Sequence, residues 1–518
     1  MSCNLDTRSG LVNCHVEPLA LPAPRVTVIG AGVGGLSAAI SLAAQGVGVT
    51  VVDAAAAPGG KLREVPVGDR RLDAGPSVLT LRAVFDELFA AAGTTLDSQL
   101  HLTRAPLLAR HYWDCEQSLD LHADTAHTAA AIGEFAGATA AREFLDFSRE
   151  ARRVFNALES SYMRVQRPNV LGLSVAILRE DPRNLVALRP FTSLWSALSR
   201  RFTDPRLRQL FARYATYCGS SPLAAPATLM LVAHAESAGV WIIEGGLYGL
   251  ARALAQAAAR LGVTFHYQRR AVDLRRSAQG FLVTLQDGDA LSSDAVVFNG
   301  DVAALREGHL GFQARAAVAV APAAASLSAV TWNLLGSPRG MPLAHHTVFF
   351  SRDYEREFRA LAAGIAVPAD PTVYVCAQDR DTAAAPAQGA AEPLFCLVNA
   401  PPSGDSQPMT SEELQQCEQR MWNQLARCGV RIEPGAPRPC VTTPTQFARL
   451  FPGTGGALYG SATHGWRASF TRPASRTRVP GLYLAGGSAH PGPGLPMAAL
   501  SGRLAAAALL ADWTSRRR

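Results

Sequence analysis

Two short apolar runs near the beginning of the chain flank a glycine-rich segment. The run Val26–Ile29 leads into Gly30–Gly35, an alanine- and leucine-rich stretch covers Ser37–Gln45, and a second apolar run, Val47–Val52, ends at Asp53. Short apolar runs bounded by glycine predict buried strands, whereas the longer stretch predicts a helix. The pattern therefore predicts a strand, a tight turn, a helix and a second strand, which together open an α/β domain.

Comparable patterns recur much later in the chain. Trp241–Leu254 leads into an amphipathic helix, a strand ends in Arg270–Leu274, and Ser293–Asp301 contains another apolar strand. Leu482–Ala485 predicts a short buried strand, and Pro496 suits the first position of a following helix. We expect these patterns to form one Rossmann-like domain assembled from three separated pieces, residues 25–80, 240–305 and 470–518.

The long segments between these pieces predict two further regions. Residues 81–239 are expected to form an inserted helical region, and residues 306–469 a mixed α+β region. Residues 1–24 are expected to be a flexible N-terminus.

Within the mixed region, Ser326–Leu335 predicts a strand, and Thr410–Glu413 has the form of a capping box at the start of a helix. Residues 367–408, which contain many Ala, Pro, Gly, Asp and Gln residues, predict a surface loop around a single strand at Thr372–Ala377.

Composition narrows the possible classes of protein. The chain has 518 residues, of which 48% are hydrophobic, but we find no run of the roughly 18 to 20 uncharged apolar residues that a spanning helix needs. The nearest candidate, Ala314–Leu335, is interrupted by Arg315 and Pro322. The nine cysteines include no CxxC pair, so their spacing predicts neither a zinc site nor a redox dithiol, and it fits a reducing cytoplasm. We therefore expect a protein that is not an integral membrane protein.

The net charge of +7 does not by itself indicate nucleic-acid binding. Lys61 is the single lysine among 49 basic residues, and the abundant arginine and alanine are typical of a coding bias. The only basic run is Arg516–Arg518 at the end of the chain. We therefore expect no nucleic-acid partner.

The glycine-rich segment has the spacing of a dinucleotide-binding turn. Gly30 permits the tight turn, Gly32 allows the backbone to approach a pyrophosphate, and Gly35 allows close packing of helix and strand. Gly34 is also expected to contact the cofactor. Asp53 follows 23 residues after Gly30 and is placed to accept hydrogen bonds from a ribose. The alternative is a purely structural turn, but strand, turn, helix, strand and acid all occur in order.

The residues after the second strand favour FAD over NAD. Pro58–Lys61 reads Pro-Gly-Gly-Lys and Leu72–Ser77 reads Leu-Asp-Ala-Gly-Pro-Ser, and this arrangement resembles that of the amine-oxidase-like flavoproteins. The resemblance implies a Rossmann-like FAD-binding domain of the amine-oxidase and GDP-dissociation-inhibitor type. It also implies that the cofactor contacts Gly60, Lys61, Gly75, Pro76 and Ser77, and that the backbone of Val272 meets the adenine.

A second motif lies near the C-terminus. Pro480–Leu500 contains Gly486-Gly487 and a helix start at Pro496. The open backbone N–H groups of that helix start, around Met497 and Ala498, are expected to face the flavin edge. This segment resembles the corresponding part of the carotenoid desaturases of the phytoene-desaturase family, and most of all the branch that acts on 1-hydroxycarotenoids in purple bacteria. The resemblance implies hydride transfer to FAD with formation of a C3–C4 double bond in an acyclic carotenoid.

The resemblance also implies where the protein works. A carotenoid must be drawn from lipid, so we expect a cytoplasmic protein that binds the photosynthetic membrane peripherally, through the arginine- and apolar-rich segment 168–217. The electron acceptor is left open between oxygen and a quinone. His464 and His490 are possible polar contacts near the flavin, no residue is named as a catalytic base, and no metal is expected.

Three readings stay open at this point. The first is the 1-hydroxycarotenoid 3,4-desaturase. The second is a phytoene or neurosporene desaturase of the same family or, more remotely, a flavin amine oxidase. The third is a non-enzymatic prenyl-lipid escort of the GDP-dissociation-inhibitor kind. Bound FAD would separate the escort from the enzymes.

Overall fold

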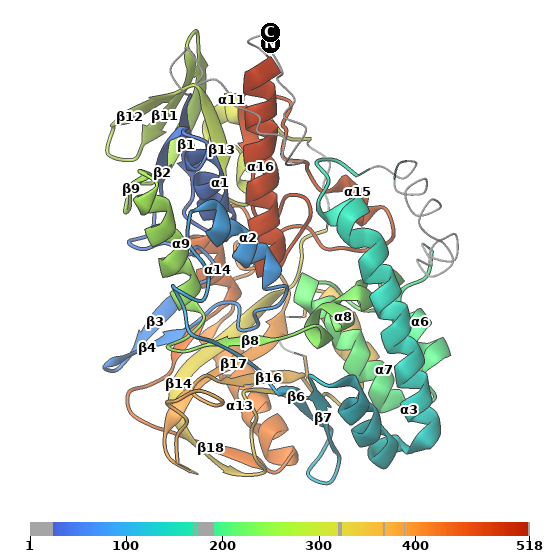
Figure 1. Cartoon of the computed structure of the whole chain (residues 1–518). Coiled ribbons are helices and arrows are strands. Elements are labelled where there is room, and N and C mark those ends of the chain that lie inside the picture. The colour runs from blue at the N-terminus through green and yellow to red at the C-terminus, as the bar shows by residue number, and fades with distance from the viewer. Residues whose placement is uncertain are drawn as a thin grey trace.

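The computed structural model describes residues 24–168, 172, 191–319, 324–365, 368–387 and 389–515. Figure 1 shows a parallel sheet with its helices in the upper part of the view, a mixed sheet below it, and a helical region at the right. The predicted flexible N-terminus lies outside the described residues apart from Pro24, as does much of the predicted membrane-facing segment 168–217.

A five-stranded parallel sheet forms the centre of the upper region. Its strands lie in the order β20 (Leu482–Leu484), β13 (Ala295–Phe298), β1 (Arg25–Ile29), β2 (Gly48–Val52) and β9 (Thr264–His266). The three predicted pieces of sequence therefore meet in a single sheet. Because β1 is central, the glycine-rich turn at its carboxyl end has a strand end on either side.

Different elements cover the two faces of this sheet. One face packs against the helices α1 (Val33–Ala43), α9 (Tyr248–Arg260) and α16 (Leu495–Ser515). The other face packs against β10 (Ala271–Ser277), β11 (Gly280–Leu285), β12 (Ala290–Ser293), α10 (Val302–Glu307) and α11 (Gly311–Arg315). This layered arrangement confirms the predicted Rossmann-like α/β domain.

Helix α16 is a long apolar helix that the sequence analysis did not single out as a candidate membrane span. Among the described residues it is the one helix long and apolar enough, by length and composition, to cross a membrane. Its mean hydropathy reaches 1.3, although the helix contains Arg503 and Asp512. In the structure 56% of its most apolar window is buried, and the helix lies along α1. Arg503 pairs with Glu87 and Asp512 with Arg476, so α16 packs as a core helix.

A mixed sheet forms the lower region. Its strands are β18 (Val430–Pro434), β14 (Ser328–Gly340), β17 (Glu392–Ala400), β16 (Val373–Ala377), β15 (His346–Phe349), β6 (Leu107–Tyr112) and β7 (Ser118–His122), in that order, with β19 (Cys440–Thr442) paired to β14. The outer face packs against α13 (Ser411–Arg427). The hairpin β3 (Glu64–Val67) and β4 (Arg70–Asp73) contacts β14 and β17.

The helical region lies beside this sheet. It contains α3 (Thr125–Leu158), the short helix η1 (Glu159–Met163), α6 (Leu194–Arg201), α7 (Pro205–Ala212), η2 (Arg213–Cys218), η3 (Ala227–Met230) and α8 (Leu231–Ser237). The helix α2 (Ala83–Ala91) packs instead against α1 and α16 of the upper region. The smaller connecting elements are β5 (Leu102–Arg104), β8 (Trp241–Ile243), α12 (Tyr354–Ala362), α14 (Pro444–Leu450) and α15 (Ala468–Thr471).

Two predictions for the insertions are incomplete. Residues 81–239 were expected to be helical, yet they also supply β5, β6 and β7, and the last two belong to the mixed sheet. Residues 367–408 were expected to hold one strand, but β17 lies there as well, in the interior of that sheet. The strand at Ser326–Leu335 and the capping box at Thr410 are both confirmed.

The contact between α1 and α16 yields a stability prediction. A Cβ on Gly502 would overlap the carbonyl oxygen of Gly34, so Gly502→Ala should lower the free energy of unfolding by about 1–3 kcal/mol. The matched control is Gly133→Ala within α3, where the new Cβ would lie 3.6 Å from the Cβ of Ala141. That control should be neutral or stabilising by up to about 1 kcal/mol. Urea denaturation measures both, and equal effects would contradict the packing.

Candidate functional site

The glycine-rich turn after β1 packs against other backbone segments. Gly30 has a φ of +104°, a conformation that favours glycine. A Cβ on Gly35 would overlap the carbonyl oxygen of Gly30, and a Cβ on Gly34 would lie 2.8 Å from the Cα of Gly486. The turn thus holds the C-terminal glycine motif directly against the start of α1.

Asn299 fills the space beneath this turn. Its Nδ2 donates to the carbonyl of Ala485 at 3.1 Å, and its Oδ1 is buried without a hydrogen-bond partner in the described part of the chain. A Cβ on Gly32 would lie 2.8 Å from that Oδ1. Sequence reasoning did not name Asn299. Its position directly after β13, at the carboxyl end of a parallel strand, is the signal that could have found it.

The second glycine motif lies against the first. Gly32 and Gly59 form a bridge, and a Cβ on Gly60 would lie 3.1 Å from the Cα of Gly32. A Cβ on Gly75 would overlap the carbonyl oxygen of Lys61. The predicted contacts at positions 32, 60, 61 and 75 are therefore brought together.

Asp53 is held by backbone donors at the end of β2. Its Oδ2 accepts from the N–H of Ala31 at 2.6 Å and its Oδ1 from the N–H of Ala55 at 2.7 Å. Burial raises the pKa of Asp53, and the two backbone hydrogen bonds oppose this. The carboxylate therefore connects the glycine-rich turn to the end of β2. The ribose contact stays a prediction.

Val272 lies in an irregular part of β10. The pairing register with β11 shifts between Ala271 and Asp273, and 38% of the Val272 surface is exposed. Arg269, three residues before Val272, donates its N–H to the carbonyl of Asp53 at 2.8 Å. Because a bulge takes backbone groups out of the ladder, this geometry fits the predicted adenine contact.

Lys61 points away from the surface toward two segments that sequence reasoning did not assign to the site. Its Nζ donates to the carbonyl of Leu458 at 2.6 Å and lies 4.0 Å from Oδ2 of Asp301. Burial lowers the pKa of Lys61, whereas Asp301 raises it. Asp301 also caps α10 by accepting from the N–H of Ala303, while its Oδ2 is buried without a hydrogen-bond partner.

The C-terminal motif is anchored by Arg472. Its Nη1 donates to the carbonyl of Gly487 at 3.1 Å, and its Nη2 donates to the carbonyl of Ser461 at 2.6 Å. Pro496 and Met497 lie in the first turn of α16. The N–H of Ala498 donates to the carbonyl of Gly494 at 2.8 Å, so it is not open toward a flavin as the sequence had suggested.

Ser77 differs from the other predicted cofactor contacts. It follows Gly75 and Pro76 along the chain, but its Oγ is 2.7 Å from the phenol oxygen of Tyr374 in the mixed sheet. A cavity between the mixed sheet and β8 is lined by Ser77 together with Asp73, Gly75, Ile242, Ile243 and Cys376. Ser77 therefore lies on the side of the site that the mixed sheet covers.

The two histidines considered from sequence have structural roles. Nε2 of His490 lies 3.0 Å from the carbonyl of Tyr162, and burial lowers the pKa of His490 to about 4. Nε2 of His464 accepts from the N–H of Ser221 at 3.2 Å, and burial lowers the pKa of His464. Both rings are neutral at pH 7, and we assign neither as a base.

One group of potential metal ligands was not visible in the sequence spacing. Ligand atoms of His345, His346 and Cys376 lie within 4.8 Å of one another in the interior. Burial raises the pKa of the Cys376 thiol, so the protonated form is favoured, whereas a metal binds the thiolate. Nδ1 of His345 already lies 2.7 Å from the carbonyl of Arg380. We assign no metal to this group.

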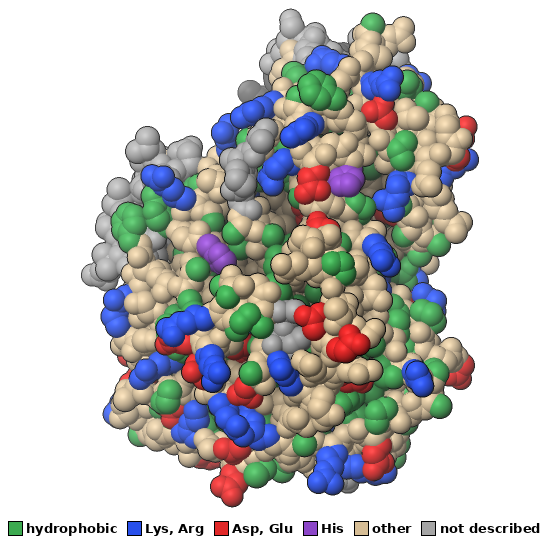
Figure 2. All heavy atoms as spheres, turned by 180° about the vertical axis from the view of Figure 1, so that it is seen from behind, with side chains coloured by type: hydrophobic (Ala, Val, Ile, Leu, Met, Phe, Trp, Pro, Cys, Tyr) green, Lys and Arg blue, Asp and Glu red, His purple; other side chains and the backbone are tan. Residues whose placement is uncertain are grey.

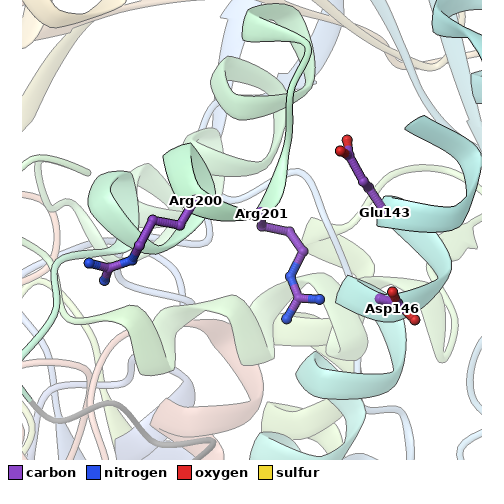
Figure 3. A pocket seen from close by; sticks show the side chains of 4 residues that line it. All are labelled: Glu143, Asp146, Arg200 and Arg201. Carbon is purple, nitrogen blue, oxygen red and sulfur yellow. The ribbon is translucent and has the colours of Figure 1, made fainter. Parts of the chain in front are cut away.

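A groove on the outer surface of the helical region is polar. Figure 3 shows Glu143 and Asp146 on α3 facing Arg201 from α6, while Arg200 points away. Arg201 pairs with Glu150, and Glu143 accepts from the N–H of Thr203 at 3.0 Å. Asp146 likewise pairs with Arg149. Because Arg201, Glu143 and Asp146 each bind a neighbour that does not line the groove, the groove carries no indication of a ligand.

Comparison with known proteins agrees with this geometry. Residues 33–510 match the model of the family described as flavin-containing amine oxidoreductases. The chain is 51% identical to the hydroxyneurosporene desaturase of Rubrivivax gelatinosus over 95% of both chains. It is 44% identical to the hydroxyneurosporene desaturase of Cereibacter sphaeroides, covering 96% of this chain and 99% of that one. An oxidoreductase from Methanosarcina mazei shares the fold, with a TM-score of 0.59 at 16% identity over 92% of this chain and 98% of that one.

The residues present fit FAD. The crossing glycine backbones leave no space for side chains beside the start of α1, whose N-terminus suits a pyrophosphate. The exposed bulge at Val272 lies on the Asp53 side of the glycine-rich turn. The Gly486 motif packs against the other side of that turn. Gly30, Gly32, Gly34, Gly60 and Lys61 would hold the diphosphate.

Gly487 allows loss of the cofactor to be separated from misfolding. Its φ is not left-handed, and the nearest atom to an added Cβ is the Cα of Pro493 at 3.5 Å. We expect Gly487→Val to reduce retained FAD at least tenfold, because the larger side chain would occupy cofactor space, while the folded apoprotein persists. Flavin absorbance per protein and circular dichroism measure the two quantities.

The control for this substitution is Gly48→Val in β2, where the nearest atom to an added Cβ lies 4.0 Å away. This variant should retain FAD at the wild-type level. Full retention of FAD by Gly487→Val would remove Gly487 from the site. Gly32 is less suitable for such a test because a side chain there would clash with Asn299.

Proposed function

Because the chain belongs to the flavin-containing amine oxidoreductase family, we propose that this FAD-dependent oxidoreductase introduces a C3–C4 double bond into 1-hydroxycarotenoids such as 1-hydroxyneurosporene. The observation that carries the proposal is the 51% identity to a hydroxyneurosporene desaturase along 95% of both chains. Both glycine motifs that hold FAD are present and packed together. This separates the chain from a prenyl-lipid escort without flavin.

The site indicates what the cofactor contributes to the reaction and what the protein contributes. Bound FAD supplies the capacity to accept a hydride. The protein orients FAD through the crossing backbones at Gly32, Gly34 and Gly486, and it places the positive charge of Lys61 beside Asp301. It presents no strong base among the histidines considered, since the lowered pKa values of His464 and His490 make both rings weak bases and one nitrogen of each is already hydrogen-bonded. The allylic C–H bonds of a polyene need little assistance of that kind.

Substrate choice distinguishes this proposal from a phytoene or neurosporene desaturase and from an amine oxidase. The purified holoenzyme should convert 1-hydroxyneurosporene to a product with red-shifted absorption, from one added conjugated double bond. Neurosporene and phytoene should react at least about tenfold more slowly, because a buried polar group would lose its partner. Equal rates on phytoene and the hydroxylated substrate would leave only the broader desaturase family, and oxidation of an amine alone would exclude a desaturase.

We further propose that the protein works at the cytoplasmic surface of the photosynthetic membrane, where its substrate lies. Phe191 is 82% exposed and its ring lies 5.6 Å from that of Trp466, over which Arg467 is stacked. An exposed aromatic ring beside a half-buried tryptophan and an exposed arginine suits an interface with anionic lipid. Figure 2 shows basic and acidic side chains interspersed over much of the opposite view, without a large patch of one sign. Oxygen or a quinone would take up the electrons.

Membrane binding can be tested with liposomes that contain phosphatidylglycerol. The protein should sediment with them and be released by high salt or mild detergent. Phe191→Ser should weaken sedimentation severalfold, because it removes the exposed ring. Phe312→Ser, at a site 87% exposed in α11, should not. Indifference of the wild-type protein to liposomes of any composition would count against a membrane-borne substrate.

A further inference from the structure

The face of the mixed sheet that meets the rest of the protein carries several buried polar side chains. The register pairs His346 with Cys376, Val348 with both His111 and Tyr374, and Tyr374 with Leu397. Because side chains alternate along a strand, all of these residues lie on one face. The other face contributes Tyr112, Trp332 and Phe349 to an apolar core against α13.

Three side chains on or beside this face form a hydrogen-bonded chain, which we call the Ser77 relay. The Oγ of Ser77 is 2.7 Å from the phenol oxygen of Tyr374, and that oxygen is 2.8 Å from Nδ1 of His346. Nε2 of His346 is buried and has no hydrogen-bond partner among the described residues. The relay thus ends in an enclosed imidazole at one side and in Ser77, which lines the cavity, at the other.

The imidazole of the relay is neutral. Burial holds the pKa of His346 well below its ordinary value, and the neighbouring His345 and the charge of Arg213 act in the same direction. A neutral imidazole has one donor and one acceptor nitrogen. The proton of Tyr374 can therefore point toward either neighbour, and Ser77 can present a donor or an acceptor to the cavity. A hydroxyl group is a partner for both states, because it both donates and accepts.

We propose that Ser77 binds the tertiary hydroxyl of the substrate, with Tyr374 and His346 as positioning residues. This inference rests on the proposed function and names the residue that recognises the hydroxylated end. An unhydroxylated chain end could satisfy neither state of Ser77. The placement also matches the reaction, since C1 is separated from C3 by one carbon. Its hydroxyl must therefore be held near the flavin, and Ser77 follows Gly75, which packs on Lys61.

The test compares selectivity in holoenzymes supplied with 1-hydroxyneurosporene or neurosporene in liposomes. Ser77→Ala should lower kcat/KM for the hydroxylated substrate about 10- to 100-fold, mainly through KM, and should raise the rate on neurosporene, because the hydroxyl that neurosporene leaves unpaired is gone. FAD content and Tm should stay at the wild-type values. Tyr374→Phe breaks the relay, so it should lower the same selectivity ratio by a smaller factor.

The matched control is Thr331→Val. Thr331 pairs with Leu397 on the same face, its Oγ1 is buried without a partner, and it is not part of the relay. Its selectivity ratio should equal that of the wild type. Loss of FAD from Ser77→Ala would show that Ser77 contacts the cofactor and would overturn the inference. An unchanged selectivity ratio in Ser77→Ala would overturn it as well. Absence of any preference in the wild type would instead overturn the proposed function.

Discussion

The close approach of backbone segments around the start of α1 is the constraint on which the rest of the structure depends. Gly34 meets Gly486, Gly32 meets Gly60, and Asn299 fills the space between them. These residues come from all three separated pieces of the Rossmann-like domain. A Cβ at several of these positions would overlap backbone atoms, which cannot rotate away as a side chain can. The same backbone contacts therefore form the cofactor site and join the three pieces of the domain.

The mixed sheet supplies the polar face that lies beside the cofactor domain and on which we place recognition of the substrate. Its outer face is an ordinary apolar core against α13, whereas its inner face carries His346, Tyr374 and other polar groups. The segment at Asp73 connects the two sheets. Its carboxylate accepts from the N–H groups of Leu247 and Tyr248, and its backbone contacts Asn333 and Gln378. Burial raises the pKa of Asp73 to about 6, so this connection is made at an energetic cost.

Local pattern predicted the parts of the fold in which one segment determines its own structure. The first strand–turn–helix–strand unit, the strand at Ser326 and the capping box at Thr410 all formed where expected. The strand β17 was missed because its composition was averaged with that of the surrounding loops. The strands β6 and β7 pair with each other in a local hairpin, which was missed within a segment expected to be helical. Only the position of β6 beside β15, more than 200 residues later, depends on pairing that no local window contains.

The sequence by itself determined the cofactor and the family, because a flavin site needs glycine at fixed spacings and those spacings are local. The tertiary structure alone decided which polar side chains complete the site. Asn299, Asp301 and Tyr374 look unremarkable in the sequence, and they become significant when strand ends and sheet faces converge. It also decided that Ser77 points to the mixed sheet, and that α16, apolar enough to span a membrane, packs along α1 instead. Side-chain direction depends on register and packing, which the order of residues does not state.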